Sequence, residues 1–394
     1  MTDMPRLTLL FIFSAAACLF AQDQTTPPAA PAPSPTSTVP DLIKAGQASY
    51  MKGDYEAARQ SFLQAWDVVK MGPQDDPMRY DVLKRLVSAR SAAAEFADAN
   101  EFLQQAISWR EQNLGPNDPK TVDDVLISVG LARSMKDFDL ALRVMSRVIT
   151  LHQRTAGGIE TIPIADDYTR IAQIYSELQS VDEAIRWLNE ALALRTKLLG
   201  PLDASLVYDL DRLGSLQITA RSYDKAEATY RHALVVRETL YGKKNADLIS
   251  TVDGLAYALF GQKKFDEAEP YYQRLLTLWV ASVGSEKHPM VAMALDKTAV
   301  FYAAQKKWDQ ADEALTRANA IRAYLLADGL SLEASQRMDE SRMADALPVY
   351  ERAIKILDPP NKVYDGERAD LQNMAGELKK VLKKPVTEPP ARKK

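Results

Sequence analysis

The sequence predicts an all-α fold, a solenoid of stacked helical pairs, and two observations carry this prediction. A pattern of apolar residues recurs about every 42 residues over most of the chain. Glycine is scarce, with 16 among 394 residues, and alanine-rich segments are frequent, which favours helix. Because one helical pair cannot bury its apolar face alone, repeated pairs must stack on one another.

The repeat is clearest in the second helix of each predicted pair. Each copy begins with a bulky residue: Tyr55, Phe96, Phe138, Val181, Tyr223, Phe265 and Trp308. Three residues later comes an alanine: Ala58, Ala99, Ala141, Ala184, Ala226, Ala268 and Ala311. A large side chain follows four further on: Phe62, Leu103, Met145, Leu188, Tyr230, Tyr272 and Leu315. This spacing keeps one face of a helix apolar, so we expect the alanines and the large side chains that follow them to pack closely.

The preceding helix and the end of each unit have their own signals. A small residue that would let a neighbouring side chain approach closely recurs in the first helix: Gly46, Val87, Gly130, Ala172, Gly214, Ala256 and Ala299. Glycines that would end the second helix recur at the same interval: Gly72, Gly115, Gly157, Gly200, Gly242 and Gly284. Each unit therefore reads as helix, turn, longer helix and glycine stop.

This pattern resembles the tetratricopeptide repeat (TPR), in the kinesin-light-chain-like subclass with repeats of about 42 residues. The residues that carry the resemblance include Leu213, Gly214, Tyr223, Ala226 and Tyr230. It covers residues 41–326 as seven units. A degenerate eighth unit is expected over 327–357, where Ala346, Tyr350 and Ala353 keep the spacing, followed by a capping helix over 358–384 and a basic disordered tail over 385–394. The resemblance implies a right-handed α-solenoid that binds a protein or peptide in its concave groove, with no catalytic residue, cofactor or metal.

The first forty residues are predicted to be an export signal and a linker. One Arg precedes an apolar run over 7–20, and a stretch rich in Pro, Ala, Ser and Thr follows. We expect a signal peptide over 1–21 and a disordered linker over 22–40. The segment AAAC also resembles a lipobox, so the alternative is a lipoprotein anchored through Cys18. Either way the protein is expected to leave the cytoplasm, as a periplasmic, secreted or membrane-anchored protein.

A row of basic residues is the candidate binding surface. The resemblance implies that the first helix of each pair lines the groove, and the residue two before its small position would face the ligand. These residues are Lys44, Arg85, Ser128, Arg170, Arg212, Gly254 and Lys297, and two more groove residues are expected at Gln173 and Tyr257. A stacked row of Arg and Lys would favour an acidic peptide. The alternative is that each cation pairs with a neighbouring aspartate, such as Asp211, Asp253 or Asp296, and leaves a solvated surface.

Composition and motifs narrow the function classes. The net charge of −4 gives no reason to expect nucleic acid. The single cysteine excludes a disulfide framework, and the histidines (His152, His232 and His288) fall at unrelated phases, which predicts packing or surface roles. No nucleotide-binding or hydrolase motif occurs. The sequence therefore predicts a non-enzymatic protein-binding scaffold, or alternatively a lipid-anchored accessory factor for secretion or polymer export, and leaves the partner and the oligomeric state open.

Overall fold

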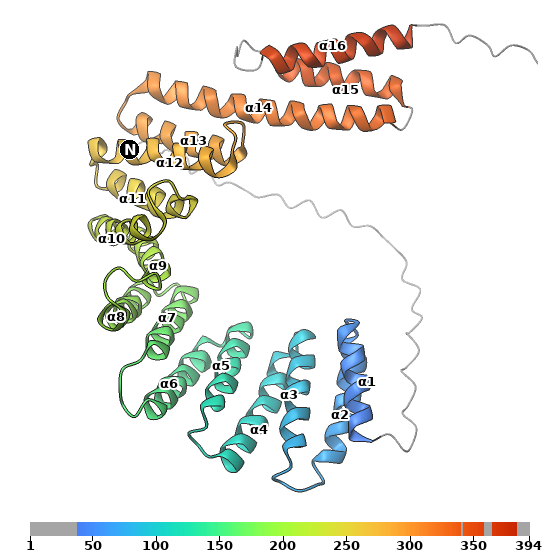
Figure 1. Cartoon of the computed structure of the whole chain (residues 1–394), viewed down its shortest axis with the longest axis vertical. Coiled ribbons are helices and arrows are strands. Elements are labelled where there is room, and N and C mark those ends of the chain that lie inside the picture. Colours follow the sequence, from blue (N-terminus) through green and yellow to red (C-terminus); the bar gives the residue numbers. More distant parts are fainter. Residues whose placement is uncertain (1–37, 340–341, 358–364, 384–394) are drawn as a thin grey trace, which may run out of the picture. The chain divides into compact units, whose positions relative to one another are not determined.

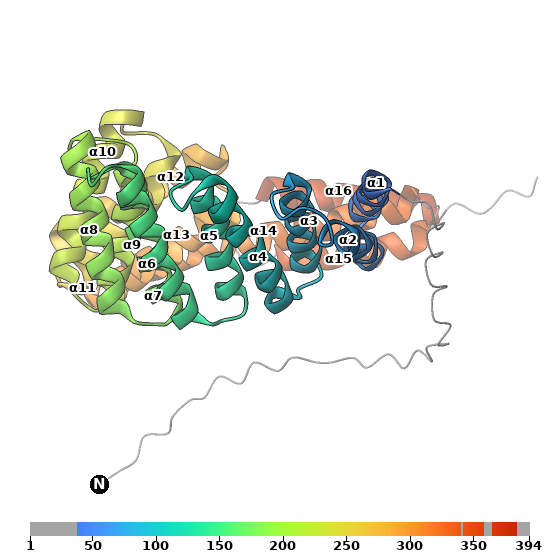
Figure 2. The same cartoon turned by 90° about the horizontal axis from the view of Figure 1, so that it is seen from below.

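The computed structural model describes residues 38–339, 342–357 and 365–383. Over these ranges the chain forms α-helices joined by short turns, and no strand (Figures 1 and 2). The helices are α1 (Val39–Met51), α2 (Tyr55–Val69), α3 (Pro77–Ala92), α4 (Phe96–Leu114), α5 (Pro119–Ser134), α6 (Phe138–Thr155), α7 (Ile162–Glu177), α8 (Val181–Leu199), α9 (Leu206–Thr219), α10 (Tyr223–Tyr241), the short 3₁₀ helix η1 (Ala246–Leu248), α11 (Ile249–Gly261), α12 (Phe265–Val283), α13 (Pro289–Ala304), α14 (Trp308–Asp339), α15 (Met343–Ile356) and α16 (Asp365–Leu382).

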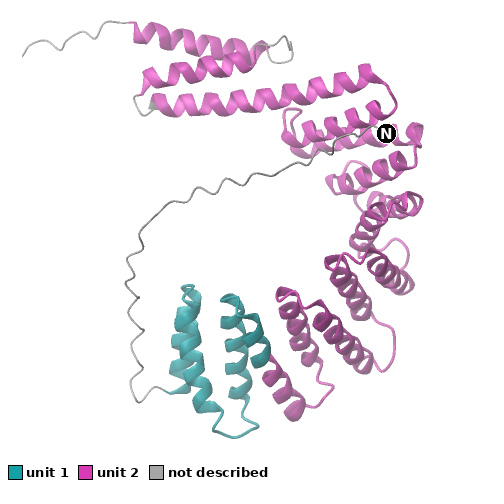
Figure 3. Ribbon diagram, turned by 180° about the vertical axis from the view of Figure 1, so that it is seen from behind, with its two compact units in different colours: residues 1–102 teal, residues 103–394 magenta. Residues whose placement is uncertain are grey.

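The chain divides into two compact units, residues 1–102 and 103–394 (Figure 3). In the first unit α1 packs on α2 and α2 on α3, around a core that includes Leu42, Phe62 and Leu86. In the second unit each pair from α5–α6 to α13–α14 packs internally, and the second helices α6, α8, α10 and α12 also pack on the first helix of the next pair. The predicted all-α solenoid of stacked helix-turn-helix units is confirmed.

The predicted repeat positions coincide with the first residues of helices and with buried side chains. The seven bulky residues are the first residues of α2, α4, α6, α8, α10, α12 and α14. All seven alanines of the repeat are buried, and so are six of the seven large side chains. The exception is Leu315 in α14, which is 44% exposed, so the prediction of close packing is wrong at that position.

One large ring held between two glycines joins the α9–α10 pair to the next pair. The Tyr230 ring of α10 lies between Gly214 of its own unit and Gly254 of the following one. A Cβ added at Gly214 would lie 2.6 Å from this ring, and one added at Gly254 would lie 2.3 Å from it. In the following unit Tyr272 has its centroid 4.6 Å from the ring of Phe301 in α13. Leu315 is exposed because no first helix follows α13–α14 in this register.

The structure corrects the predicted register of one first helix. Gly130 of α5 is exposed, and a Cβ built there meets no atom within 4 Å. The packed residue is its neighbour Val129, which is buried. The outward residue two positions earlier is therefore Ile127, which is partly exposed, while the predicted Ser128 is buried.

The turn inside each pair contains a residue in the left-handed backbone region. Gly53 holds this place in the first pair, two residues before the second helix. Six non-glycine residues hold it in the later pairs, with φ between 57° and 61°: Ala94, Lys136, Gln179, Arg221, Lys263 and Lys306. Of the glycines predicted to end the second helices, all but Gly72 have positive φ.

The ends of the array differ from the sequence expectation. Helix α1 begins at Val39, so the predicted linker over 22–40 ends inside this helix. Residues 1–37, with the predicted signal and Cys18, and the tail over 385–394 lie outside the described residues. Helix α14 continues for 32 residues, with Ala327 at the position where Gly200, Gly242 and Gly284 end the earlier second helices, and α15 packs on it through buried Ala346, Tyr350 and Ala353. Helix α16 packs on α15 within the expected capping segment (Figures 1 and 2).

A polar clamp reinforces the joint between α10 and the next unit. Glu227 accepts hydrogen bonds from Lys264 Nζ at 2.7 Å, Gln262 Nε2 at 2.8 Å and Arg231 Nε at 2.8 Å. Burial acts to raise the pKa of Glu227, but the bonds from Lys264, Arg231 and Gln262 outweigh it and lower that pKa to about 2. The ionised carboxylate therefore stabilises this joint.

We predict opposite effects for two glycine-to-alanine changes. Gly254→Ala should lower the free energy of unfolding by about 1–3 kcal/mol, because the clamped Tyr230 ring has no room to move. Gly130→Ala should raise it by about 0.5–1 kcal/mol, because alanine is the better helix former and its Cβ meets open space. Urea unfolding of both variants measures the difference, and equal effects would contradict the assigned register.

We predict that Glu227→Gln removes a pH-dependent part of the stability. The folded-state pKa is depressed, so the contribution of Glu227 is present above its unfolded pKa and is lost as pH falls towards about 2. At pH 7 the variant should lose up to about 3 kcal/mol, and the difference from the parent should shrink below about pH 4.5. Urea unfolding at several pH values measures this, with Glu267→Gln, at an exposed ion pair with Arg231, as the control. A difference that stays constant with pH would count against the clamp.

Candidate functional site: the first-helix face

The outward face of the first helices in the second unit carries large apolar side chains. Tyr208 of α9 is 61% exposed, Tyr257 of α11 is 45% exposed and Val300 of α13 is 61% exposed, and Met293 of α13 is also exposed. These residues occupy two repeating positions, fifteen and eight residues before the next bulky residue. Serine holds the equivalent places elsewhere, at Ser215 and Ser250. We call Tyr208, Arg212, Tyr257, Met293, Lys297 and Val300 the first-helix surface.

Two cations of the predicted basic row, Arg212 and Lys297, lie on the same helices, but three of the row's five cations already pair with carboxylates. Arg85, in the first unit, binds Asp81 at 2.9 Å. In the second unit Arg170 binds the buried Asp167 at 2.9 Å, and Lys297 Nζ lies 2.5 Å from Asp253. These pairs resemble the alternative considered from the sequence, in which each cation pairs with an aspartate and leaves a solvated surface. The aspartates are not, however, the residues next to each cation in the sequence.

Arg212 and Lys44 differ from the other three cations. Arg212 donates a hydrogen bond to the Tyr208 hydroxyl at 2.9 Å, and its guanidinium carbon lies 5.4 Å from the centroid of the same ring. Lys44 is exposed on α1, in the first unit. Neither forms an ion pair within the part of the chain that the structure describes. Arg212 is therefore the cation of the first-helix surface that is most available to a ligand carboxylate.

The two remaining predicted groove residues lie on this face. Gln173 of α7 is half-buried and Tyr257 of α11 is exposed. The Tyr257 ring packs edge-on against Tyr223, with centroids 6.4 Å apart, and lies 6.1 Å from Phe260. Its orientation is therefore fixed by neighbouring rings while nearly half of its surface remains accessible. The sequence predicted Tyr257 as a groove residue but missed Tyr208, Met293 and Val300. Their spacing from the next bulky residue identifies them once the register of the first helices is known.

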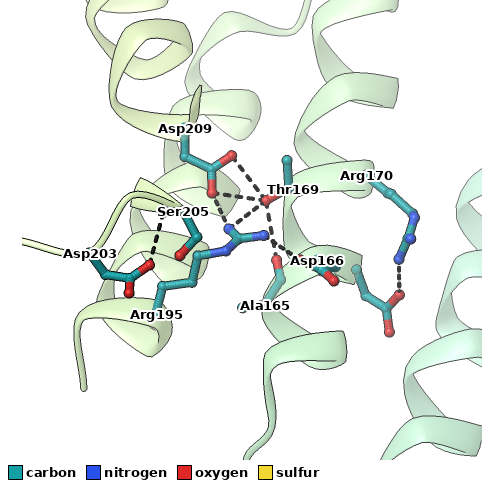
Figure 4. Close-up of polar contacts among 9 residues, drawn as sticks. Ala165, Asp166, Thr169, Arg170, Arg195, Asp203, Ser205 and Asp209 are labelled. Carbon is teal, nitrogen blue, oxygen red and sulfur yellow. Dashed lines mark hydrogen bonds and ion pairs between the residues drawn. The ribbon is translucent and has the colours of Figure 1, made fainter. Parts of the chain in front are cut away.

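Beneath this face, a ladder of buried polar contacts joins successive helical pairs of the second unit. In α4, α6, α8 and α10 the fifteenth residue is a cation that contacts the following first helix: Arg110 binds Asp124, His152 binds Asp167, Arg195 binds Asp209, and Arg237 binds Thr251. Figure 4 shows Arg195 between Asp209 and Asp166, with Thr169 bonded to both Asp209 and Arg195. Burial raises the pKa of Asp209, opposed by Arg195 and by the hydrogen bond from Thr169. Removing Arg195 would leave the buried Asp209 without the cation that it contacts, and removing Asp209 would leave the buried Arg195 with Asp166 as its remaining carboxylate.

This ladder of pairs corrects one sequence prediction. His152 does not fall at an unrelated phase, because it occupies the position of Arg110, Arg195 and Arg237, and its Nδ1 lies 2.6 Å from Asp167. His232 lies 2.7 Å from the carbonyl of Pro201, and the ring of His288 accepts a hydrogen bond from Met290 N at the start of α13. Sequence reasoning missed the ladder, although the interval of about 42 residues between its cations was available as a signal.

Neither a metal site nor a membrane span is found in the described ranges. No group of three or more His, Cys, Asp or Glu residues there is placed to hold a metal ion. No helix of these residues is both long enough and apolar enough to cross a bilayer.

The fold and the repeat geometry define a class of protein built from tetratricopeptide-like helical pairs. Residues 163–239 and 247–323 match the tetratricopeptide repeat family model. These two segments therefore belong to the tetratricopeptide repeat family, a fold that suits a role in protein interaction. No curated protein sequence matches it.

Several solved structures are similar to this chain at low sequence identity. The C-terminal part of a TPR repeat-containing protein from Cytophaga hutchinsonii is 14% identical, with a TM-score of 0.50 over 71% of this chain and 95% of that one. BtubC (BKLC) from P. vanneervenii is 19% identical, with a TM-score of 0.45 over 63% of this chain and 94% of that one. The TPR-like repeats of a putative kinesin light chain from Podosopora anserina are 16% identical, with a TM-score of 0.45 over 52% and 97%. These likenesses concern the fold.

We predict that Asp209→Ala destabilises the second unit by about 2–4 kcal/mol, because Arg195 stays buried and keeps only part of its partners. Asp182→Ala, in the exposed first turn of α8, should cost less than about 0.5 kcal/mol. Thermal and urea unfolding compare the two variants. A cost for Asp209→Ala as small as that of the control would mean that the ladder contributes little.

Proposed function

We propose that this protein is a non-enzymatic scaffold that binds an extended segment of a partner protein on the first-helix surface. The observation that supports the proposal most strongly is the exposure of Tyr208, Tyr257 and Val300 on three successive first helices. Isolated exposed apolar residues are common, but apolar residues at repeating positions on adjacent helices favour an interaction surface. Aromatic side chains supply large contact areas at low entropic cost.

The charges beside this surface refine the chemistry of the ligand. Most of the predicted basic row is neutralised by Asp81, Asp167 and Asp253, so a ligand gains little from those cations. Arg212, stacked on Tyr208, remains available for one carboxylate. The ligand that fits is therefore an extended segment with apolar or aromatic side chains and a single acidic residue near Arg212, and not a uniformly acidic peptide.

We predict that a triple change, Tyr208→Ser, Tyr257→Ser and Val300→Ser, abolishes partner binding without unfolding the chain. Serine is tolerated at the equivalent positions Ser215 and Ser250 of the same array. A matched control changes Val235 and Leu240, exposed apolar residues of the second helix α10, to Ser. Partners are captured from extract on all three baits, identified by mass spectrometry, and their segments titrated against the purified proteins.

Each outcome of this experiment has a clear meaning. A segment that binds the parent and the control, but binds the triple variant at least about tenfold more weakly, supports the proposal. A further loss for Arg212→Glu would support the contact with an acidic residue. Equal binding to all three baits would contradict the proposal and place recognition elsewhere.

We also propose that the scaffold acts in the cell envelope or outside the cytoplasm, on the strength of the apolar run over 7–20 and the polar stretch that follows. Intact mass of the protein purified from its producing cell should match a chain that begins at Gln22. A diacylated chain that begins at Cys18 would support the lipid-anchored accessory factor instead. An unprocessed chain in the cytoplasm would contradict export.

A further inference from the structure

The last regular pair, α13–α14, has an open stacking face. In α10 the residues that meet the next first helix are Tyr223, Tyr230 and Arg237, which contact Gly261, Gly254 and Thr251. The residues at the same positions of α14 are Trp308, Leu315 and Arg322. Trp308 is 63% exposed and Leu315 is 44% exposed, because α14 runs on as a single helix and supplies no following first helix in this register. In Figure 1, α15 and α16 lie beside the C-terminal half of α14.

The ladder of polar contacts between helical pairs ends at Arg322 on this face. Arg237 binds Asp211 of its own first helix and Thr251 of the next one. Arg322 binds the equivalent residue of its own first helix, Asp296, and has no next first helix to contact. The open face therefore offers two apolar side chains and one cation in the arrangement that α4, α8 and α10 present to the following first helix.

The first helix of the chain carries the complementary set. Nothing precedes α1 in the described residues, and its positions equivalent to Gly261, Gly254 and Asp209 are Met51, Lys44 and Asp41. Met51 is 80% exposed. Asp41 is exposed and bonded only within its own helix cap, to Thr38, whereas its equivalents Asp124, Asp167 and Asp209 are buried against the preceding cation.

We propose that copies of this chain associate end to end, with α1 of one copy stacked on the open face of α13–α14 of another. Trp308 and Leu315 of one copy then cover the side of α1 that includes Met51, Ala48 and the aliphatic part of Lys44. Arg322 meets Asp41 as Arg195 meets Asp209. The occupant is a second copy because the two ends of the array carry opposite charges at the ladder positions, Arg322 on the open face and Asp41 on α1. The contact joins two different surfaces, so association continues beyond a dimer.

The test measures self-association of the full chain by sedimentation equilibrium across a range of concentrations. The parent should grow from monomer through dimer to larger species. Asp41→Lys and Arg322→Glu should each lower the association constant about tenfold or more, and the double variant should recover to within about threefold of the parent. Thermal melts monitored by circular dichroism verify that each variant is folded. A parent that stays monomeric, or association that neither substitution changes, would overturn the proposal.

Cross-linking places the contact directly. In a Cys18→Ser background, mixing a Met51→Cys chain with a Trp308→Cys chain should give disulfide-linked pairs that contain one of each. Mixing Met71→Cys with Trp308→Cys should not, although Met71 is as exposed as Met51. Equal cross-linking in both mixtures would mean random collision, and would overturn the assignment of the two faces. Both readouts are independent of any partner, so they remain valid if the proposed ligand surface is wrong.

Discussion

The burial of one large side chain of each second helix from α2 to α12 is the packing on which the array depends. Tyr230 shows it most completely, because its ring is held by Gly214 in its own unit and by Gly254 in the next. The same residue therefore packs a pair internally and fixes the position of its neighbour. The polar clamp at Glu227 and the ladder pair of Arg195 with Asp209 act across the same kind of joint. Stability of such an array is a sum of nearest-neighbour terms.

This construction separates the surface that holds the array together from the surface that is free to bind. Packing uses one face of each first helix, and the ladder lies beneath it, so exposed outward positions such as Ser215 and Val300 are less constrained by packing. Residues such as Ser215 and Tyr257 can therefore alternate at equivalent positions without changing the fold. The same construction requires a special arrangement at the ends, where a stacking face has no neighbour, as at Trp308.

The sequence predicted the fold well because packing repeats and is therefore visible as a period. The first residues of seven helices and the buried alanines followed from spacing alone. Three features did not. The left-handed turn residues were hidden because only Gly53 is glycine there, while Ala94 and five other residues adopt the same φ. Gly130 was wrongly predicted to contact a neighbouring side chain, because a glycine in a helix looks the same in the sequence whether or not another residue packs on it. The exposed apolar residues were missed because the residue type alone does not show whether a tyrosine or a valine is buried or exposed.

Local coupling between neighbouring units is the central claim, and native-state hydrogen exchange of a Tyr272→Ala variant tests it most directly. Tyr272 is buried at the joint between α12 and α13, against Phe301. Its loss should open a cavity at that joint. We predict faster exchange in α11 to α14, with α5 and α6 unchanged. Faster exchange of equal size in every helix of the second unit would contradict the account, because it would mean that the unit unfolds as one cooperative body.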